Sequence, residues 1–142
     1  DHAIKELCRL YIAKSVDCQY CGGQRSVLAM QRGTTESQVD DILDFETSQR
    51  FDDRERTALA WAMAIAWDPA LADDDLWDRL HRHFTEPQLI ELGHFIALTL
   101  GQQRFLKTVG VRHGEVLADT DAGLAPEEAA KLRAGQQTAT TA

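Results

Sequence analysis

The chain has 142 residues, of which 44% are hydrophobic, and this is enough for one domain with its own hydrophobic core. Its net charge of −8 argues against nucleic acid or a membrane surface as a partner, because both are anionic. Three cysteines without a signal-like apolar segment predict a cytoplasmic protein rather than a disulfide-stapled secreted domain. The chain starts at Asp1, without an initiator Met, so we expect the natural protein to begin upstream.

Apolar residues recur at helical spacing and predict an all-α protein, since no long stretch has the period of two that a strand requires. A first helix is expected at 3–16, and a second at 19–32, ended by Gly33. The two would form an αα-hairpin with Cys18 at its turn. Cys8 lies among apolar residues of the first helix, which is typical of a buried structural thiol.

Two capping boxes mark the next helix starts. Thr35 with Gln38 predicts a short helix, and Asp52 with Glu55 predicts a long one at about 53–67. The alanines of the longer helix would allow close contact with a neighbouring helix.

The last part of the helical region contains two further predicted helices, at 73–84 and from Thr85 to about 109. The final helix is apolar over more than one face, which predicts burial against its own core and against a neighbouring subunit of a homo-oligomer. We expect His94 in this helix to be a hydrogen-bonded core residue, and His81 and His83 to lie on the surface.

Composition changes after the final helix, where Ala, Asp, Thr, Gly and Gln dominate. This divides the chain into a helical domain at 1–112 and a tail at 113–142. The tail is expected to be loose or draped over a partner, apart from a short helix at 126–134.

The chemistry centres on Cys18 and Cys21, which form a CxxC pair at a predicted helix start. Backbone N–H groups there stabilise a thiolate and lower the pKa of a cysteine. Such a thiolate attacks peroxides or disulfides, and its neighbour then closes a small disulfide ring that an external dithiol reopens. Zinc would need two more ligands, and the sequence has no second CxxC or well-spaced His pair, so we expect neither a metal nor a cofactor.

Glu6 lies twelve residues before Cys18, and a folded-back hairpin would bring its carboxylate near the two thiols. There it could take a proton from a thiol or from a bound water. The alternative is a surface glutamate that pairs with Lys5 or Arg9.

These residues resemble a known family. The first segment of the chain looks like the alkylhydroperoxidase D-like branch of the carboxymuconolactone decarboxylase superfamily. The match lies in KELCRLYIAKSVDCQYCGGQRS, where eleven residues separate Glu6 from the CxxC pair. Two later segments are similar to the second half of such proteins, namely RFDDRERTALAWAMAIAWDP and HFTEPQLIELGHFIALTLGQQRF. The resemblance therefore covers roughly 3–112. The combined Glu and CxxC spacing is more specific than a lone CxxC.

The resemblance implies an alkylhydroperoxidase D-like helical bundle that assembles into dimers, trimers or hexamers. It also implies a thiol-dependent peroxidase cycle acting on hydroperoxides, in which Cys21 is peroxidatic, Cys18 resolves the oxidised sulfur and Glu6 belongs to a proton relay. A thioredoxin-like or lipoyl-bearing protein would be the reductant.

The sequence departs from the family pattern at two positions. Arg25 stands where the family has His, and it cannot shuttle protons near neutral pH. Its charge could instead hold a thiolate or an anionic substrate group, or pair with Glu6. Tyr20 stands where His is frequent, and it could donate a hydrogen bond to the sulfur or to a peroxide oxygen, or serve only in packing.

Two other functions stay open at this point. The first is a lyase or decarboxylase acting on a small carboxylate, with Arg25 binding the carboxylate and Glu6 moving a proton. The second is a non-catalytic oligomeric protein that keeps the family fold.

Overall fold

The computed structural model describes residues 1–111 and 123–140. Within these ranges the regular structure is helical, and the only β-type pairing is an isolated bridge between Gln24 and Leu124. The predicted all-α class is therefore confirmed at this level. The α-helices, in chain order, are α1 (His2–Ser15), α2 (Gln19–Gly23), α3 (Val27–Gln31), α4 (Glu36–Asp40), α5 (Asp53–Ala66), α6 (Asp74–His83), α7 (Glu86–Val109) and α8 (Pro126–Thr140). Two 3₁₀ turns, η1 (Ile42–Asp44) and η2 (Pro69–Leu71), connect them.

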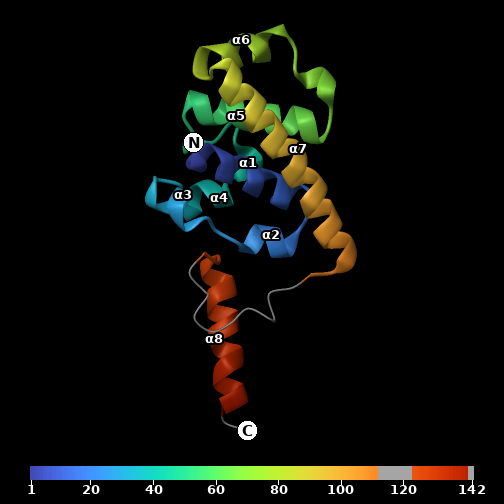
Figure 1. Ribbon diagram of the computed structural model, residues 1–142. Coiled ribbons are helices and arrows are strands. Elements are labelled where there is room, and N and C mark those ends of the chain that lie inside the picture. Colours follow the sequence, from blue (N-terminus) through green and yellow to red (C-terminus); the bar gives the residue numbers. More distant parts are fainter. Residues whose placement is uncertain (112–122, 141–142) are drawn as a thin grey trace.

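Helix α1 is the centre of the molecule, and it packs against both α5 and α7 (Figure 1). Its side chains are buried around much of its circumference, as expected for a helix with neighbours on several sides. Leu7, Leu10 and Ile12 are among the largest fully buried side chains. Ala58 on α5 lets the two helices approach closely, and the Cys8 thiol lies 3.6 Å from its carbonyl oxygen.

The predicted helix starts agree with the structure. Thr35 and Gln38 form a reciprocal capping box at α4, and Asp52 and Glu55 form another at α5. The Gln38 amide also donates to the Glu55 carboxylate, so the two boxes are joined to each other.

The prediction of one helix over 19–32 is wrong. It is divided into α2 and α3 by an extended segment that includes Gln24 and Ser26. Ser26 caps α3, because its hydroxyl accepts from the Ala29 N–H at 3.3 Å. Gly22 and Gly23 end the first piece, as expected for residues with poor helix propensity.

Helix α7 is apolar on two opposite faces. Leu89, Leu92 and Ile96 are buried in the core, whereas Ile90, Leu98, Phe105 and Val109 are all more than half exposed. His94 lies on the exposed side, so its predicted place in the core is wrong, although its Nδ1 lies 2.8 Å from the Ile90 carbonyl oxygen.

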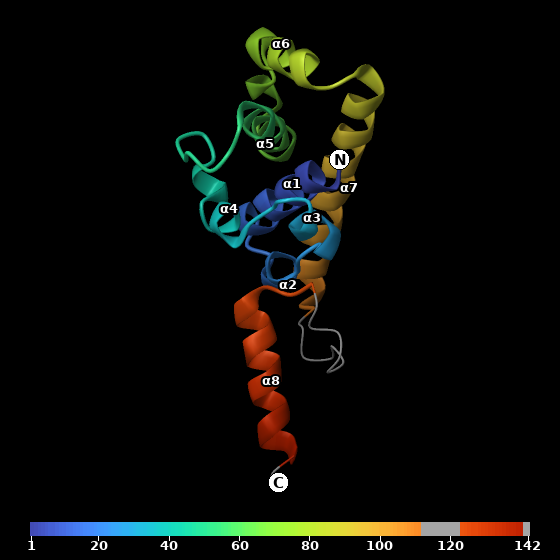
Figure 2. The ribbon, with the colours of Figure 1, turned by 90° about the vertical axis from the view of Figure 1, so that its left-hand side faces the viewer.

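The expected short helix at 126–134 exists, and it continues to Thr140 as α8. Figures 1 and 2 both show α8 extending away from the helical body, with its first turn beside α2. The rest of the expected loose tail falls largely on 112–122, outside the described residues.

Candidate functional site

The turn between α1 and α2 places Cys18 in the cap position of α2. Asp17 has a φ of 54°, a left-handed conformation that reverses the chain directly after α1. The Cys18 N–H then donates to the Ala13 carbonyl at 2.8 Å, and the Cys18 sulfur accepts from the Cys21 N–H at 3.4 Å. The predicted hairpin with Cys18 at its turn is therefore present, but α2 has only five residues.

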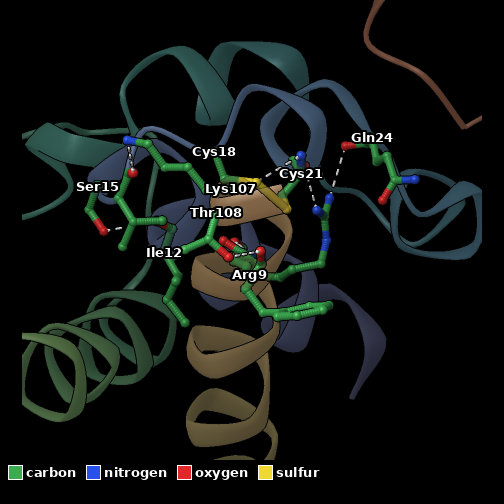
Figure 3. Close-up of a disulfide and its surroundings, with 11 residues drawn as sticks. Arg9, Ile12, Ser15, Cys18, Cys21, Gln24, Lys107 and Thr108 are labelled. Atoms are coloured by element: carbon green, nitrogen blue, oxygen red, sulfur yellow. Dashed lines mark hydrogen bonds between the residues drawn. A yellow bond between two sulfur atoms is a disulfide. The ribbon is translucent and has the colours of Figure 1, made fainter. Parts of the chain in front are cut away.

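Cys18 and Cys21 form a disulfide, with their Cα atoms 5.4 Å apart (Figure 3). Each residue is 4% exposed. The two cysteines pack in a small apolar cluster with Ala13 of α1 and Leu106 of α7, so a residue near the end of α7 contributes to this site.

Two open grooves meet at Cys18. One, of about 710 Å³, is lined by residues of α1, α2 and the start of α8, and the other, of about 460 Å³, lies toward the end of α7. Cys18 lines both grooves, whereas Cys21 lines neither of them. Of the two cysteines, Cys18 is the one that lines these grooves.

Glu6 is buried next to the segment between α2 and α3, and both of its carboxylate oxygens accept hydrogen bonds. The Arg9 guanidinium donates to Oε1 and Oε2, each at 2.8 Å, and the Ser26 N–H donates to Oε1 at 2.8 Å. The alternative pairing with Arg9 is thus present, although Glu6 is 4% exposed and does not lie on the surface. No hydrogen bond within the described residues joins Glu6 to either sulfur.

Arg25 is committed to the protein's own structure. Its side chain is 7% exposed and donates to both oxygens of Glu36, at 2.8 and 2.9 Å. It also donates to the carbonyls of Gly22 and Gln24, at 2.7 and 2.8 Å. The suggested pairing of Arg25 with Glu6 is wrong, because Arg9 holds that position.

The end of α2 is completed by groups from three parts of the chain. A helix leaves its last carbonyls without intrahelical donors. Here Arg9 donates to Cys21 O at 2.6 Å, Arg25 donates to Gly22 O, and the Ala125 N–H donates to Gly23 O at 2.6 Å. The segment before α8 therefore pairs with the backbone directly after the cysteines.

Gly123 is required for this pairing. Its φ is +109°, and a Cβ there would lie 2.9 Å from the Arg25 carbonyl oxygen. The Arg25 N–H also donates to the Gly123 carbonyl, so two backbone hydrogen bonds fix the start of α8 against the site.

Tyr20 is half-buried, packs against the cysteine cluster and lines the smaller groove. This position is compatible with both roles considered for it, packing and hydrogen bonding to a substrate.

Cys8 is the third cysteine, and it is separate from the pair. It is free and fully buried, and burial raises its pKa to about 12, opposed by a smaller effect of a backbone hydrogen bond. The prediction of a structural thiol is confirmed.

Apart from the Glu6–Arg9 pair, the contacts of Arg9, Glu36 and Ala125 were not predicted from the sequence, and neither was Gln103, whose side-chain amide donates to the Arg9 carbonyl at 3.0 Å. The i,i+3 spacing of Glu6 and Arg9 is a signal for their pair. The other contacts join residues distant in sequence, and nothing in the local pattern marks them.

The described part of the chain contains no group of three or more His, Cys, Asp or Glu side chains placed to hold a metal ion. Likewise, no helix in the described ranges has the length and apolar character needed to cross a bilayer.

No family model matches the chain. It is 31% identical over 105 residues to the uncharacterized protein YnjA of Escherichia coli. These residues are 74% of this chain and 58% of that protein. It is 33% identical over 92 residues to an uncharacterized protein found in two strains of Mycobacterium tuberculosis, covering 65% of this chain and 32% of the relative. The chain thus spans between about a third and three fifths of the length of these relatives.

Proposed function

We propose that the protein is a thiol-dependent oxidoreductase of the alkylhydroperoxidase D-like type, which reduces hydroperoxides through Cys18 and Cys21. The observation that carries the proposal is the disulfide between these two residues, with Cys18 lining two open grooves. A structural staple would not need access from outside, whereas a redox disulfide must be reached by its reductant.

In the proposed cycle, the Cys21 thiolate attacks the outer oxygen of a hydroperoxide. The O–O bond breaks, Cys21 becomes a sulfenic acid, and the alkoxide leaves as an alcohol after taking a proton. The Cys18 thiol then attacks the sulfenic sulfur, so that a disulfide forms and water leaves.

The groove geometry supports Cys18 as the sulfur that the reductant attacks. A dithiol protein, thioredoxin-like or lipoyl-bearing, would form a mixed disulfide with Cys18 and release Cys21 as the thiolate. Its second thiol would then free Cys18. This order regenerates the attacking thiolate at Cys21.

The contacts of Glu6 change its proposed role. Both of its oxygens accept hydrogen bonds from the loop and from Arg9, so we assign it to holding the loop rather than to a direct proton transfer with sulfur.

The lyase alternative loses its carboxylate-binding residue, because four hydrogen bonds already commit Arg25 to Glu36 and to the α2 carbonyls. We therefore retain the redox function as the single proposal.

A second copy of the chain is proposed to cover the exposed apolar side of α7. This side includes Ile90, Leu98 and Phe105, each more than 60% exposed, and apolar surface of this kind is typical of an interface. Leu98→Lys is expected to lower the molar mass measured by light scattering to that of the monomer. An unchanged mass for the variant would exclude this side as the interface.

The function is tested by adding an organic hydroperoxide to the reduced protein and measuring disulfide formation. Cys18→Ser is expected to stop at the Cys21 sulfenic acid, which a dimedone adduct detects by mass. Cys21→Ser is expected to abolish the reaction. A Cys21→Ser variant that consumes peroxide as fast as the wild type would refute the assignment.

A further inference from the structure

The Arg9 guanidinium joins α1 to the segment that follows the redox pair. It binds the Glu6 carboxylate, and the same group donates to Cys21 O at 2.6 Å and to Gln24 O at 2.9 Å. Figure 3 shows Arg9 reaching from α1 to this segment beside the disulfide. One side chain thus touches the backbone of a reacting residue without touching its sulfur.

Glu6 extends the same connection, because it accepts from the Ser26 N–H at 2.8 Å. The backbone is therefore tied to α1 at residues 21, 24 and 26. Gln103 of α7 donates to the Arg9 carbonyl at 3.0 Å, so the anchoring residue is itself fixed to the longest helix of the core.

This anchoring matters because α2 is short. A helix of five residues is far below the length that is stable on its own, about 12 to 15 residues. In the oxidised protein the disulfide also restrains Cys21. Once that bond is reduced, charged side chains still hold this backbone: Arg25 binds the carbonyls of Gly22 and Gln24, and Arg9 is the one that binds the Cys21 carbonyl itself.

We propose that Arg9 is a positioning residue for the redox pair: it holds the reduced Cys21 in the geometry needed to reform the disulfide. This inference rests on the proposed redox function and specifies how the fold regulates that site. Two thiols held close together have a high effective concentration for one another, so Arg9 favours the disulfide over the dithiol.

The test is the thiol–disulfide equilibrium with dithiothreitol. In this exchange, the reagent's two thiols become a cyclic disulfide while the Cys18–Cys21 bond becomes two thiols, so two electrons and two protons move together. The equilibrium constant is read from the oxidised fraction after acid quench and alkylation, across a series of redox buffers.

Arg9→Lys keeps a positive charge beside Glu6 but lacks the planar fork that reaches the carboxylate and both carbonyls together. We expect the variant's equilibrium to shift toward the dithiol by about tenfold, which corresponds to about 30 mV for a two-electron couple. Arg9→Met should shift it at least as far. Arg50→Lys is the control, because Arg50 forms an exposed ion pair with Asp41 and neither residue lines a groove at Cys18. Its equilibrium constant should equal that of the wild type.

Urea unfolding of the oxidised and reduced forms completes the test. If Arg9 only stabilises the fold, its replacement will lower the free energy of unfolding of the oxidised and reduced forms equally and leave the redox equilibrium unchanged. That result overturns the proposal. If Arg9→Met fails to fold, Arg9→Lys decides the matter. Failure of the wild type to react with hydroperoxide would refute the proposed function, whereas an unshifted equilibrium in the Arg9 variants would refute the positioning role alone.

Discussion

Replacing Arg25 distinguishes a structural from a catalytic role for this residue, which stands where the family that the sequence resembles has His. Arg25→Met removes a guanidinium that makes a bidentate pair with Glu36 and donates to two carbonyls at the end of α2. We expect the variant to be less stable than the wild type because Glu36 and the Gly22 carbonyl lose this donor, and the Gln24 carbonyl keeps only the hydrogen bond from Arg9.

The size of the effect follows from burial. Breaking a fully buried ion pair costs about 3 to 5 kcal/mol, but the Glu36 side chain is 37% exposed and water will solvate much of its charge. The carbonyls of Gly22 and Gln24 lose hydrogen bonds worth about 1 to 3 kcal/mol together. We therefore expect a decrease of about 2 to 4 kcal/mol in the free energy of unfolding.

The assay is urea unfolding followed by circular dichroism, with the midpoint and slope fitted separately. Glu36→Gln is the matched control, because it weakens the same pair while leaving the carbonyl contacts intact, and it should cost less. The double variant measures the coupling between the two residues. An Arg25→Met protein as stable as the wild type, yet unreactive toward peroxide, would refute the structural role and indicate a direct catalytic one.

Three further predictions concern other parts of the molecule. Iodoacetamide at pH 8 should label Cys18 and Cys21 in the reduced native protein and spare Cys8, whose pKa is about 12; labelling of all three at equal rates, measured by mass spectrometry, would contradict its burial. Gly93→Ala places a Cβ 2.9 Å from the Trp61 ring and should lower the free energy of unfolding by about 1 to 3 kcal/mol, whereas Gly101→Ala, with open space at its Cβ, should not destabilise. The pKa of His81 is raised, first by its hydrogen bond to the Trp77 carbonyl and then by its hydrogen bond to Glu86. Protonated His81 therefore stabilises the fold fully below about pH 6.5, and this stabilisation is lost as the pH rises through the folded-state pKa. His81→Gln should remove this pH dependence from the urea midpoints, and an identical pH profile in both proteins would refute the prediction.

The helices could be predicted because their signals are local. Capping boxes such as Thr35 with Gln38 and Asp52 with Glu55, together with helical spacing of apolar residues, locate α4, α5 and α7 within a few residues. The division of 19–32 has local signals in Gly22, Gly23 and the capping Ser26, whereas the contact that Glu6 makes with the Ser26 N–H joins residues twenty positions apart and could not be predicted.

The candidate site was predicted in part for the same reason. The cysteine pair and its position at a helix start follow from spacing alone, and so does the burial of Cys8. The partner of Arg25 could not be inferred, because Glu36 competes with Glu6 for the guanidinium and only the path of the chain decides between them. The pairing of Gly123 and Ala125 with the end of α2 likewise joins segments about a hundred residues apart.

In the proposed function, Cys21 is an activated thiolate that reacts with hydroperoxide. The most direct measurement is the pH dependence of Cys21 alkylation in the Cys18→Ser variant, combined with stopped-flow mixing of the reduced wild type and an organic hydroperoxide. We expect a Cys21 pKa well below the ordinary value of about 8.5 and disulfide formation much faster than that of a free dithiol. A Cys21 pKa at the ordinary value, together with disulfide formation in the wild type no faster than in a free dithiol, would contradict the proposed function.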